Sequence, residues 1–359
     1  MISYDIVIIG GGPAGMAAAL SAQQAGTADI LLVERADSLG GILNQCVHYG
    51  FGLLYFGEEL TGQQYAERFV SRIVNSGIDI YTGTSAVGLY PNGNVLLSGE
   101  KCGLLEVKAK AVILASGCRE RPIGTLPVVG TRPSGIFTAG MAQKMVNIGG
   151  YDIGNRFIIL GSGDIGLIMA RQLKQLGKDI LAIVEKEEKC GGLKRNQINS
   201  IDQFGIPLFT CCTVVKIHGK DRIAGVTVLD LISGQKRDMD CDTLITSVGL
   251  IPERELAEEA SIDGKIPNWL FLCGNTCYVH DLVDDVTYEA ELIGRQAANY
   301  VLHKESEIHI LSSIRNEISP SKIFCIACPK ACKLIKTEKG YLGAVCGRKD
   351  PVPNIMSSK

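Results

Sequence analysis

The stretch Tyr4-Asp-Ile-Val-Ile-Ile-Gly10-Gly-Gly12-Pro-Ala-Gly15 lies near the start of the 359-residue chain, and it decides the fold. A second copy reads Arg156-Phe-Ile-Ile-Leu-Gly161-Ser-Gly163-Asp-Ile-Gly166, in which Gly161, Gly163 and Gly166 repeat the spacing of Gly10, Gly12 and Gly15. Each copy joins an apolar run, which predicts a buried parallel strand, to the glycine spacing of a dinucleotide-binding turn. We therefore predict an α/β fold with two Rossmann-type dinucleotide-binding domains.

The three repeated glycines have separate roles in such a turn. The first permits the tight turn, the second lets a pyrophosphate approach the backbone, and the third lets the helix pack closely on the strand. The pyrophosphate then lies at the N-terminus of the following helix, where free N–H groups and the helix dipole favour negative charge. The residues between the glycines complete the predicted contact sets: Pro13 and Ala14 in the first copy, and Ser162, Asp164 and Ile165 in the second.

The repeat continues beyond the glycines. Glu34 and Glu185 each end the second predicted strand of their copy, at the same separation from Gly10 and from Gly161, and Gly40-Gly41 matches Gly191-Gly192. A carboxylate at this point accepts hydrogen bonds from ribose hydroxyls and repels a 2′-phosphate. Glu185 therefore favours NAD over NADP at the second site, although the neighbouring Lys186 argues the other way.

Composition sets the broad class. A chain of this length with 46% hydrophobic residues can bury two cores, and 42 glycines suit a protein with many βα turns. The net charge of −2 gives no electrostatic case for nucleic acid. No apolar stretch approaches the roughly 18 residues needed to span a bilayer, and the first strand leaves no room for a signal peptide. We expect a cytoplasmic protein, in which 13 cysteines indicate thiols, metal ligands or redox groups rather than disulfides.

Two similar stretches mark the predicted domain boundaries. Both Ala111–Gly117 and Thr243–Pro252 are apolar runs that end in small residues, as expected where a chain crosses between domains. The prediction is a discontinuous first domain over 1–117 and 251–303, a second domain over 118–250, and a third module over 304–359. A helix is expected from about Val286 to Leu302, with Asp284 or Asp285 as its N-cap.

Several segments resemble the two-dinucleotide-binding-domain flavoproteins of the thioredoxin-reductase, glutathione-reductase and NADH-oxidase type. The closer likeness is to NADH-oxidase-like proteins encoded beside glycerol-3-phosphate dehydrogenases, and it covers about residues 4–302. The segments that carry it are Gly40-Gly-Ile-Leu-Asn-Gln45-Cys46-Val-His48-Tyr-Gly50-Phe-Gly52, Glu58-Glu-Leu-Thr-Gly62, Gly117-Cys-Arg-Glu-Arg-Pro122 and His280-Asp-Leu-Val-Asp284.

The resemblance implies FAD at the first site, NAD(H) at the second, and a hetero-oligomer with an FAD-dependent dehydrogenase subunit. It also implies further cofactor-binding residues. In the first domain these are Arg35, Gly40, Gly41, Gln45, Cys46, Val87, Ala115, Ser116, Gly117, Gly274 and Asn275, and in the second domain the residue is Gly249. Two departures stand out. Asn275 replaces the Asp that usually holds a ribityl hydroxyl, and only ten residues separate Ala260 from Phe271, where relatives place a longer hairpin.

Cys46 lies five residues after Gly41, where disulfide reductases of this superfamily bring a redox cysteine over the flavin. No second cysteine occurs in 40–60, and the second domain has no Cys-x-x-Cys pair. Cys46 is therefore either a single thiolate or sulfenate centre with His48 as its proton partner, or a packing residue beneath the flavin.

The C-terminal segment holds Cys325, Cys328, Cys332 and Cys346, and it resembles the small cysteine-rich protein found next to such enzymes. Four thiolates can hold either a [4Fe–4S] cluster or a tetrahedral zinc ion. Three clustered cysteines, one followed by Pro329, and a distant fourth favour the iron–sulfur cluster, with zinc as the alternative.

The predicted function is electron transfer between NAD(H), FAD and this cluster in the service of a glycerol-3-phosphate-type or related dehydrogenase. Two alternatives remain. One is a separate NADH oxidase or thiol-dependent reductase that works through Cys46. The other is a non-catalytic nucleotide-binding subunit of a heteromeric amine or hydroxy-acid dehydrogenase.

Overall fold

The structure is a computed structural model that describes residues 2–302, 334–337 and 340–343. Contacts divide the chain into two units, with the crossings at Cys118/Arg119 and Ile251/Pro252. These crossings lie one residue from the predicted boundaries at 117/118 and 250/251. At the crossings, strands β9 (Cys118–Glu120) and β19 (Leu250–Pro252) form a two-stranded sheet.

Unit 1 is built on a seven-stranded sheet in the order β5-β2-β1-β8-β7-β6, with β20 also paired to β8. Strands β5, β2, β1, β8 and β20 run parallel, and β6 and β7 add an antiparallel extension. The strands are β1 (Ile2–Ile9), β2 (Ile30–Val33), β5 (Asp79–Tyr81), β6 (Thr84–Leu89), β7 (Asn94–Gly99), β8 (Gly103–Leu114) and β20 (Leu270–Leu272), and β3 (Tyr49–Phe51) and β4 (Leu60–Thr61) pair separately.

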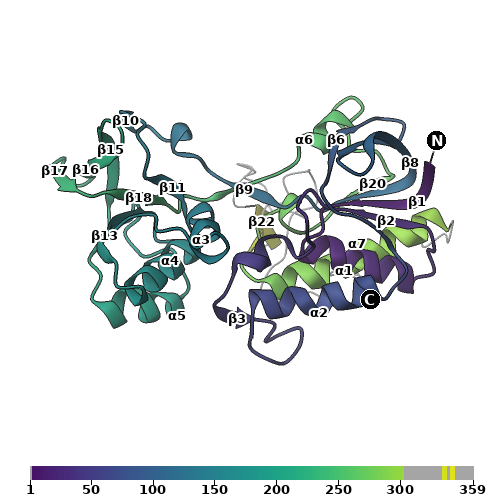
Figure 1. Cartoon of the computed structure of the whole chain (residues 1–359), viewed down its shortest axis with the longest axis horizontal. Helices are drawn as coiled ribbons and strands as arrows, with labels where there is room; N and C mark the ends of the chain where they lie inside the picture. The colour runs from purple at the N-terminus through teal and green to yellow at the C-terminus, as the bar shows by residue number, and fades with distance from the viewer. Residues whose placement is uncertain (1, 303–333, 338–339, 344–359) are drawn as a thin grey trace. The chain divides into compact units, whose positions relative to one another are not determined.

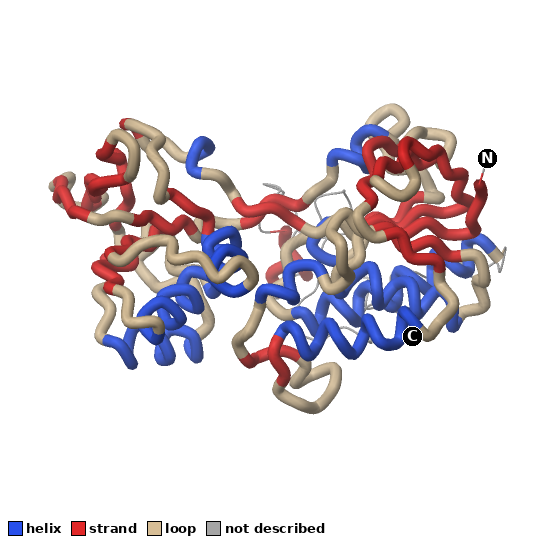
Figure 2. Tube along the Cα trace, in the orientation of Figure 1, coloured by secondary structure: helices blue, strands red, loops and turns tan. Residues whose placement is uncertain are grey.

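Three helices cover one face of this sheet: α1 (Pro13–Gln24), α2 (Gly62–Val74) and α7 (Val283–Val301) (Figure 1; Figure 2). The alanine-rich α1 is almost entirely buried, and a Cβ at Gly294 of α7 would lie 2.2 Å from the Ala18 carbonyl oxygen. Small residues therefore let α1 and α7 pack backbone to backbone. The shorter helices are α6 (Glu255–Glu259), η1 (Gly41–Gln45) and η4 (Gly274–Thr276).

The predicted N-cap of the last helix is wrong. Helix α7 begins at Val283 with Leu282 as its N-cap, so Asp284 and Asp285 lie in its first turn. Asp284 is buried beside the backbone of Gly52, Leu54 and Tyr55, which acts to lower its pKa, but its Oδ1 has no hydrogen-bond partner among the described residues. Burial is the larger effect and raises the pKa of Asp284, so this carboxyl group is desolvated beside the 52–55 loop and does not cap its own helix.

Unit 2 has a five-stranded parallel sheet in the order β11-β18-β12-β13-β14, with α3 and α4 beside it and an antiparallel sheet β10-β15-β16-β17. The strands of both sheets are β10 (Val129–Gly130), β11 (Ile136–Thr138), β12 (Arg156–Leu160), β13 (Asp179–Val184), β14 (Leu208–Phe209), β15 (Cys212–Gly219), β16 (Ile223–Asp230), β17 (Lys236–Asp240) and β18 (Thr243–Thr246). The helices are η2 (Ile123–Thr125), α3 (Ala139–Asn147), α4 (Asp164–Gln175), α5 (Lys194–Gln197) and the π-helix η3 (Ile198–Asp202).

The two sheets repeat one another. The order β5-β2-β1-β8-β20 of unit 1 corresponds strand for strand to β14-β13-β12-β18-β11 of unit 2. The hydrogen bond from Gly10 N to Val33 O measures 2.8 Å, and its counterpart in the second copy, from Gly161 N to Val184 O, also measures 2.8 Å. This confirms the predicted α/β fold with two Rossmann-type halves.

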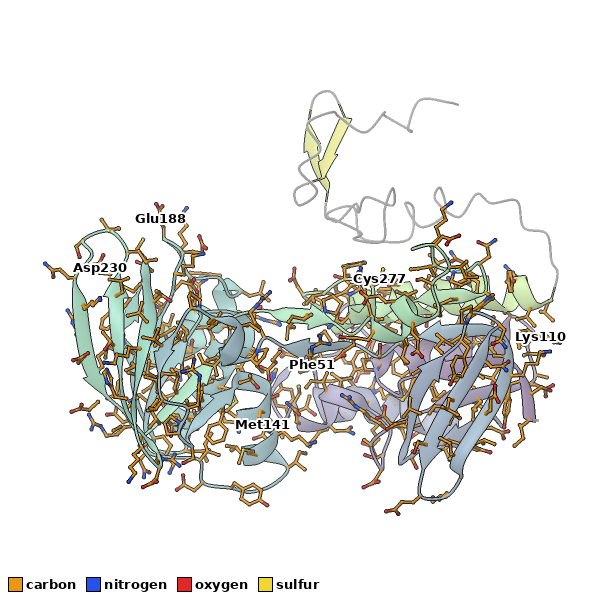
Figure 3. All side chains as sticks on the ribbon, turned by 90° about the horizontal axis from the view of Figure 1, so that it is seen from above. Phe51, Lys110, Met141, Glu188, Asp230 and Cys277 are labelled. Atoms are coloured by element: carbon orange, nitrogen blue, oxygen red, sulfur yellow. The ribbon has the colours of Figure 1, made fainter. Side chains whose placement is uncertain are left out.

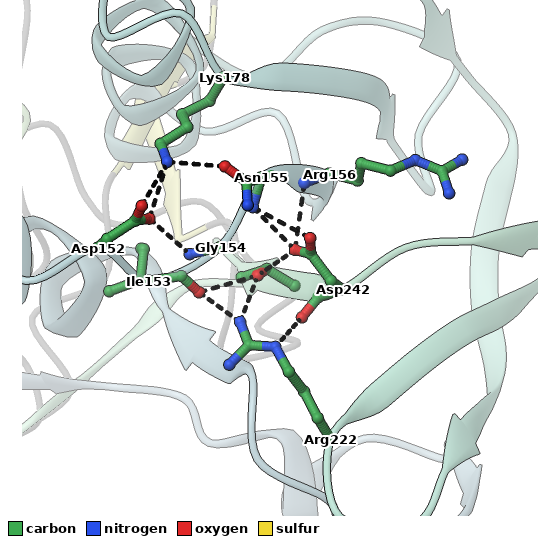
Figure 4. A network of polar contacts seen from close by, with 9 residues as sticks. Asp152, Ile153, Gly154, Asn155, Arg156, Lys178, Arg222 and Asp242 are labelled. Carbon is green, nitrogen blue, oxygen red and sulfur yellow. Dashed lines mark hydrogen bonds and ion pairs between the residues drawn. The ribbon is translucent and has the colours of Figure 1, made fainter.

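The amino ends of the unit 2 strands are joined by a polar network (Figure 4). Asp242 accepts hydrogen bonds from the backbone N–H groups of Asn155 and Arg156, and Arg222 Nε donates to the Asp242 carbonyl oxygen at 2.9 Å. The chain passes through this network at Gly154, where φ is +148° and an added Cβ would lie 2.0 Å from Thr243 Oγ1. The network lies at the opposite ends of the strands from the glycine turns, which indicates a structural role.

Gly154→Ala should therefore lower the free energy of unfolding of unit 2 by about 3 kcal/mol, since strain and a steric clash act together. Gly150→Ala is the matched control, because its φ is +63° but nothing lies within 4 Å of an added Cβ. That control should cost only about 1 kcal/mol. Native-state hydrogen exchange of β12 amides measures both values, and equal losses would contradict the steric argument.

Within the described part of the chain, no helix combines the length and hydrophobicity that crossing a bilayer requires. In the C-terminal segment, β21 (Leu334–Thr337) and β22 (Gly340–Gly343) form an antiparallel hairpin that pairs Leu334 with Gly343. The rest of the predicted third module at 304–359 lies outside the described residues.

Candidate functional site

The first glycine turn lies between β1 and α1. Gly10 has a φ of +112°, and a Cβ there would lie 2.3 Å from the Ala115 carbonyl oxygen. A Cβ at Gly15 would lie 1.8 Å from the Gly10 carbonyl oxygen, so the third glycine lets α1 pack on the turn. Gly12, the N-cap, is different, because the nearest atom to an added Cβ is 4.0 Å away. The second glycine therefore leaves open space at the helix N-terminus, where a pyrophosphate fits.

A carboxylate holds this turn in place. Glu34, which follows β2 and is 8% exposed, accepts hydrogen bonds from Gly11 N at Oε2 and from Ala36 N at Oε1, each at 2.7 Å. The carboxylate thus joins the glycine turn to the end of β2. We call this arrangement the carboxylate clamp. It places a buried acceptor beside the turn, as the ribose of a dinucleotide requires.

Unit 2 contains the same clamp at the equivalent positions of the second copy. Glu185 accepts from Ser162 N at 2.8 Å and from Glu187 N at 2.9 Å. The Ser162 hydroxyl makes a further bond to Glu185 and accepts from Gly191 N at 2.8 Å. Ser162 is fully buried, so in this structure its side chain packs the turn from inside.

The second turn has less free space than the first. A Cβ at Gly163, the N-cap of α4, would lie 3.3 Å from Ser247 Oγ. Asp164 begins α4, and its Oδ1 accepts from Leu193 N at 2.8 Å and from Asn196 Nδ2 at 2.6 Å. Asp164 therefore holds the start of α5 beside the N-terminus of α4, while the following Ile165 is partly buried.

The carboxyl ends of β1, β8 and β20 meet beside the first turn, because Leu114 is paired with both Ile9 and Leu272. The segment after β20 touches the turn directly, since a Cβ at Gly274 would lie 2.7 Å from Ala14 Cβ. In parallel α/β sheets this edge is where ligands bind. Its predicted residues Ala115, Ser116, Gly117, Gly274 and Asn275 are thus brought together with Gly10, Gly12, Pro13, Ala14 and Gly15.

Two residues of these edges were missed by the sequence reasoning. Thr276 is fully buried, and its hydroxyl accepts from Gly117 N at 2.7 Å. Ser247 donates its backbone N–H to Leu160 O at 2.7 Å, as Ala115 does to Ile9 O at 2.8 Å. Aligning the two similar crossing stretches would have matched Ser247 to Ala115, whereas no sequence signal singles out Thr276.

The remaining predicted residues divide by exposure. Gly40 and Gly41 have φ values of +115° and +57°, and a Cβ at Gly41 would lie 3.0 Å from Gly12 Cα. The 3-10 helix η1 begins at Gly41, and Gln45 is buried at its end. By contrast Arg35 is exposed, Val87 is half exposed at a bulge in β6, and Gly249 has a φ of +102° with open space around it.

Cys46 is a buried thiol. Its Sγ lies 3.4 Å from the Ile42 carbonyl oxygen, and a Cβ at Gly62 of α2 would lie 2.5 Å from Cys46 Cβ. Burial raises the pKa of Cys46 to about 12, so the group is protonated at neutral pH. His48 Nδ1 lies 3.0 Å from the Tyr49 carbonyl oxygen, and its ring packs on Phe51. These contacts favour the packing interpretation of Cys46 over the thiolate centre.

Two more cysteines lie near the first turn: Cys273 is buried and Cys277 is partly buried. Burial raises the pKa of Cys277, which follows η4 and is labelled in Figure 3, to about 12. The predicted metal ligands Cys325, Cys328, Cys332 and Cys346 lie outside the described residues. Among the residues that are described, no group of three or more His, Cys, Asp or Glu side chains could hold a metal ion.

Comparison with known proteins agrees with this geometry. A family model described as pyridine nucleotide-disulphide oxidoreductase matches residues 4–267. Thioredoxin reductase of Bacillus subtilis is 27% identical over 269 residues, which cover 73% of this chain and 79% of the relative. The hydrogen cyanide synthase subunit HcnB of Pseudomonas protegens is 27% identical over 292 residues, which cover 73% of this chain and 60% of the relative.

Among solved structures, T. acidophilum thioredoxin reductase superposes with a TM-score of 0.67 at 19% identity, over 85% of this chain and 99% of that one. L-proline dehydrogenase from P. horikoshii gives a TM-score of 0.58 at 21% identity, over 90% of this chain and 61% of that one. At such identities the superpositions show the fold alone, and they agree with the thioredoxin-reductase-like architecture predicted from the sequence.

Proposed function

The chain belongs to the pyridine nucleotide-disulphide oxidoreductase family and is an FAD-dependent oxidoreductase of pyridine nucleotides; on that premise we propose that it exchanges electrons between NAD(H) and a partner dehydrogenase. The exit route proposed is a [4Fe–4S] cluster held by Cys325, Cys328, Cys332 and Cys346. When bound, FAD supplies hydride exchange with nicotinamide and single-electron exchange with a one-electron acceptor.

The duplicated carboxylate clamp carries the two-nucleotide part of this proposal. Gly11 N donates to Glu34 and Ser162 N donates to Glu185, at 2.7 and 2.8 Å, at equivalent positions of the two copies. A buried acceptor beside an open helix N-terminus is what the ribose and pyrophosphate of one dinucleotide need together. Two such clamps in one chain, each beside the N-terminus of a helix, support one dinucleotide per unit.

A difference between the units supports FAD in unit 1. In unit 2, β11 runs straight into α3, and Glu120 accepts hydrogen bonds from Gly140 N and Met141 N in the first turn of that helix. In unit 1, the corresponding β20 and α7 are separated by the segment 273–282. That added segment lies beside the first glycine turn and provides room and contacts for a resident cofactor. The clamp residue Glu185 supports NAD(H) over NADP(H) in unit 2, because its carboxylate would repel a 2′-phosphate.

Two observations on described residues, at Cys46 and in the tail hairpin, support the proposed route of electrons through the cluster. The raised pKa of Cys46 leaves little thiolate for a disulfide-exchange route. In the tail, hairpin β21–β22 pairs Leu334 with Gly343 and lies in sequence between Cys332 and Cys346. In the proposed four-thiolate site, this hairpin would connect the third and fourth cysteines.

The partner is proposed from relatives. One of them is named as a subunit of hydrogen cyanide synthase, and one structure of the same fold is an L-proline dehydrogenase. We extend this to a hetero-oligomer in which an FAD-dependent dehydrogenase subunit, of the glycerol-3-phosphate type or related, gives electrons to this chain or receives them from it.

A tail variant tests the route. Cys325→Ser/Cys328→Ser in the full-length chain should lose its iron, because two of four ligands are removed, while NADH-dependent dye reduction remains within about twofold of wild type. Electron transfer to the co-purified dehydrogenase should fall at least about a hundredfold, as expected when one carrier of a relay is lost. Metal analysis and rate measurements on the anaerobically purified complex provide both readouts.

The control is Cys102→Ser, which changes a partly exposed cysteine of unit 1. Zinc instead of iron in the wild type, or unchanged transfer in the double variant, would contradict the relay. If NADH fails to bleach the flavin of the wild type under anaerobic conditions, the nucleotide-binding-subunit alternative gains support instead.

A further inference from the structure

The loop between β20 and α7 contains a closed set of hydrogen bonds that the proposed function does not use. It begins at Asn275, just beyond the edge formed by the carboxyl ends of β1, β8 and β20. Gly274, directly before it, lies against Ala14 at the N-terminus of α1. The side chain of Asn275 is therefore at the ligand-binding edge of unit 1.

Two groups of His280 face the Asn275 amide oxygen, and the first is its backbone N–H. His280 N donates to Asn275 Oδ1 at 3.0 Å. A backbone N–H can only donate, so the oxygen of the amide must face it and the nitrogen must point the other way. Asn275 Nδ2 accordingly lies 3.6 Å from Cys118 Sγ, next to the end of the Ala115–Gly117 wall.

The imidazole of His280 closes the set. Its side chain is 2% exposed, Nδ1 lies 3.2 Å from Asn275 Oδ1, and Nε2 lies 2.7 Å from Glu289 Oε2. Glu289 Oε1 in turn accepts from Gly274 N at 3.0 Å. Each ring nitrogen therefore lies within hydrogen-bond distance of a side-chain oxygen, Nδ1 of the Asn275 amide and Nε2 of the Glu289 carboxyl group on α7.

We propose that His280 is a positioning residue for the flavin: its imidazole adds to its backbone N–H a second contact on Asn275 Oδ1, so that Nδ2, a donor, and not Oδ1, an acceptor, is presented to bound FAD, while Glu289 holds the imidazole in place. The inference rests on FAD binding in unit 1, which family membership supports, and it is independent of the cysteine-rich tail. Without the imidazole the amide is held by the backbone N–H alone and turns more freely, so part of the FAD binding free energy would be spent on ordering it.

Two substitutions separate the two ends of the imidazole. His280→Asn keeps an amide nitrogen at the position of Nδ1 and so retains the donor to Asn275, whereas His280→Gln reaches the position of Nε2 and retains only the donor to Glu289. The full-length chain is stripped of flavin and titrated with FAD, with flavin fluorescence giving Kd. The Gln variant should bind about tenfold more weakly than wild type, the worth of one oriented hydrogen bond, and the Asn variant within about twofold.

His218→Asn is the control, because His218 lies in unit 2, where its Nε2 contacts Thr227 Oγ1 at 2.7 Å. Its FAD affinity should equal that of wild type. The proposal is overturned if the two His280 variants lose equal FAD affinity, or if the Asn variant loses more than the Gln variant. It is also overturned if the loss of FAD affinity follows a fall in the melting temperature of the flavin-free protein, because His280 would then have a purely structural role. If neither His280 variant folds, Asn275→Ala must show the same tenfold loss with unchanged melting of the flavin-free protein, or the proposal fails. A wild type that binds no FAD would overturn FAD binding in unit 1 itself.

Discussion

Gly12→Ala should yield a folded protein that has lost its flavin. The backbone at Gly12 is extended, with φ of −76°, and the atom nearest to an added Cβ is 4.0 Å away, so the methyl group fits the flavin-free chain. The same methyl group fills the space that a pyrophosphate needs at the N-terminus of α1. We expect the Kd for FAD to rise by at least about a hundredfold, equivalent to about 2.7 kcal/mol.

The measurement is the ratio of flavin to protein absorbance after purification, followed by titration of the flavin-free protein with FAD and a circular dichroism spectrum. Gly163→Ala is the matched variant in unit 2, and it should keep its flavin while losing affinity for NADH. Gly15→Ala should not fold, since its Cβ would lie 1.8 Å from the Gly10 carbonyl oxygen. Full flavin content in Gly12→Ala, or flavin loss in Gly163→Ala, would refute the assignment of the two turns.

Alkylation of Cys46 should be about a thousandfold slower at pH 7.5 than that of an ordinary exposed cysteine. The thiolate is the reacting form, and the pKa of about 12 for Cys46 compares with about 8.5 for an unperturbed thiol. Because the pKa is raised, the thiolate fraction increases tenfold per pH unit up to about pH 12, with no plateau near pH 9.

Iodoacetamide labelling of the intact protein, resolved by peptide mass spectrometry between pH 7 and 10, measures this rate. Cys102, which is partly exposed in the turn between β7 and β8, serves as the internal reference. Rapid alkylation of Cys46 that also abolishes NADH-dependent dye reduction would restore the thiol-dependent alternative.

The duplicated fold could be predicted because its signals are local. Gly10, Gly15 and their counterparts Gly161 and Gly166 are required by backbone contacts within the turn or with the adjoining strand, and these contacts recur wherever the turn occurs. The clamp residues Glu34 and Glu185 could be found for the same reason, since each follows the strand next to its own turn.

What the sequence could not provide depends on contacts between distant segments. Thr276 bonds to Gly117, 159 positions away. Asp284 is buried beside the 52–55 loop, so a residue that the sequence places like an N-cap does not act as one. The roles of His280 and Glu289 follow from the loop that brings them together and not from any spacing pattern. The partners of these polar side chains depend on which polar groups become buried together when the chain packs, because buried polar groups need hydrogen-bond partners.

The position of unit 2 between β8 and β20 has a consequence for the order of synthesis. On the ribosome, residues 119–251 emerge before β20 and α7, although these complete the sheet and the helical layer of unit 1. Unit 2 can fold while the first segment of unit 1 is still incomplete. At that stage α7, which packs on α1, and β20, which pairs with β8, have not yet been made. The sheet and helical layer of unit 1 are thus completed only when α7, the last helix among the described residues, leaves the exit tunnel after Val301.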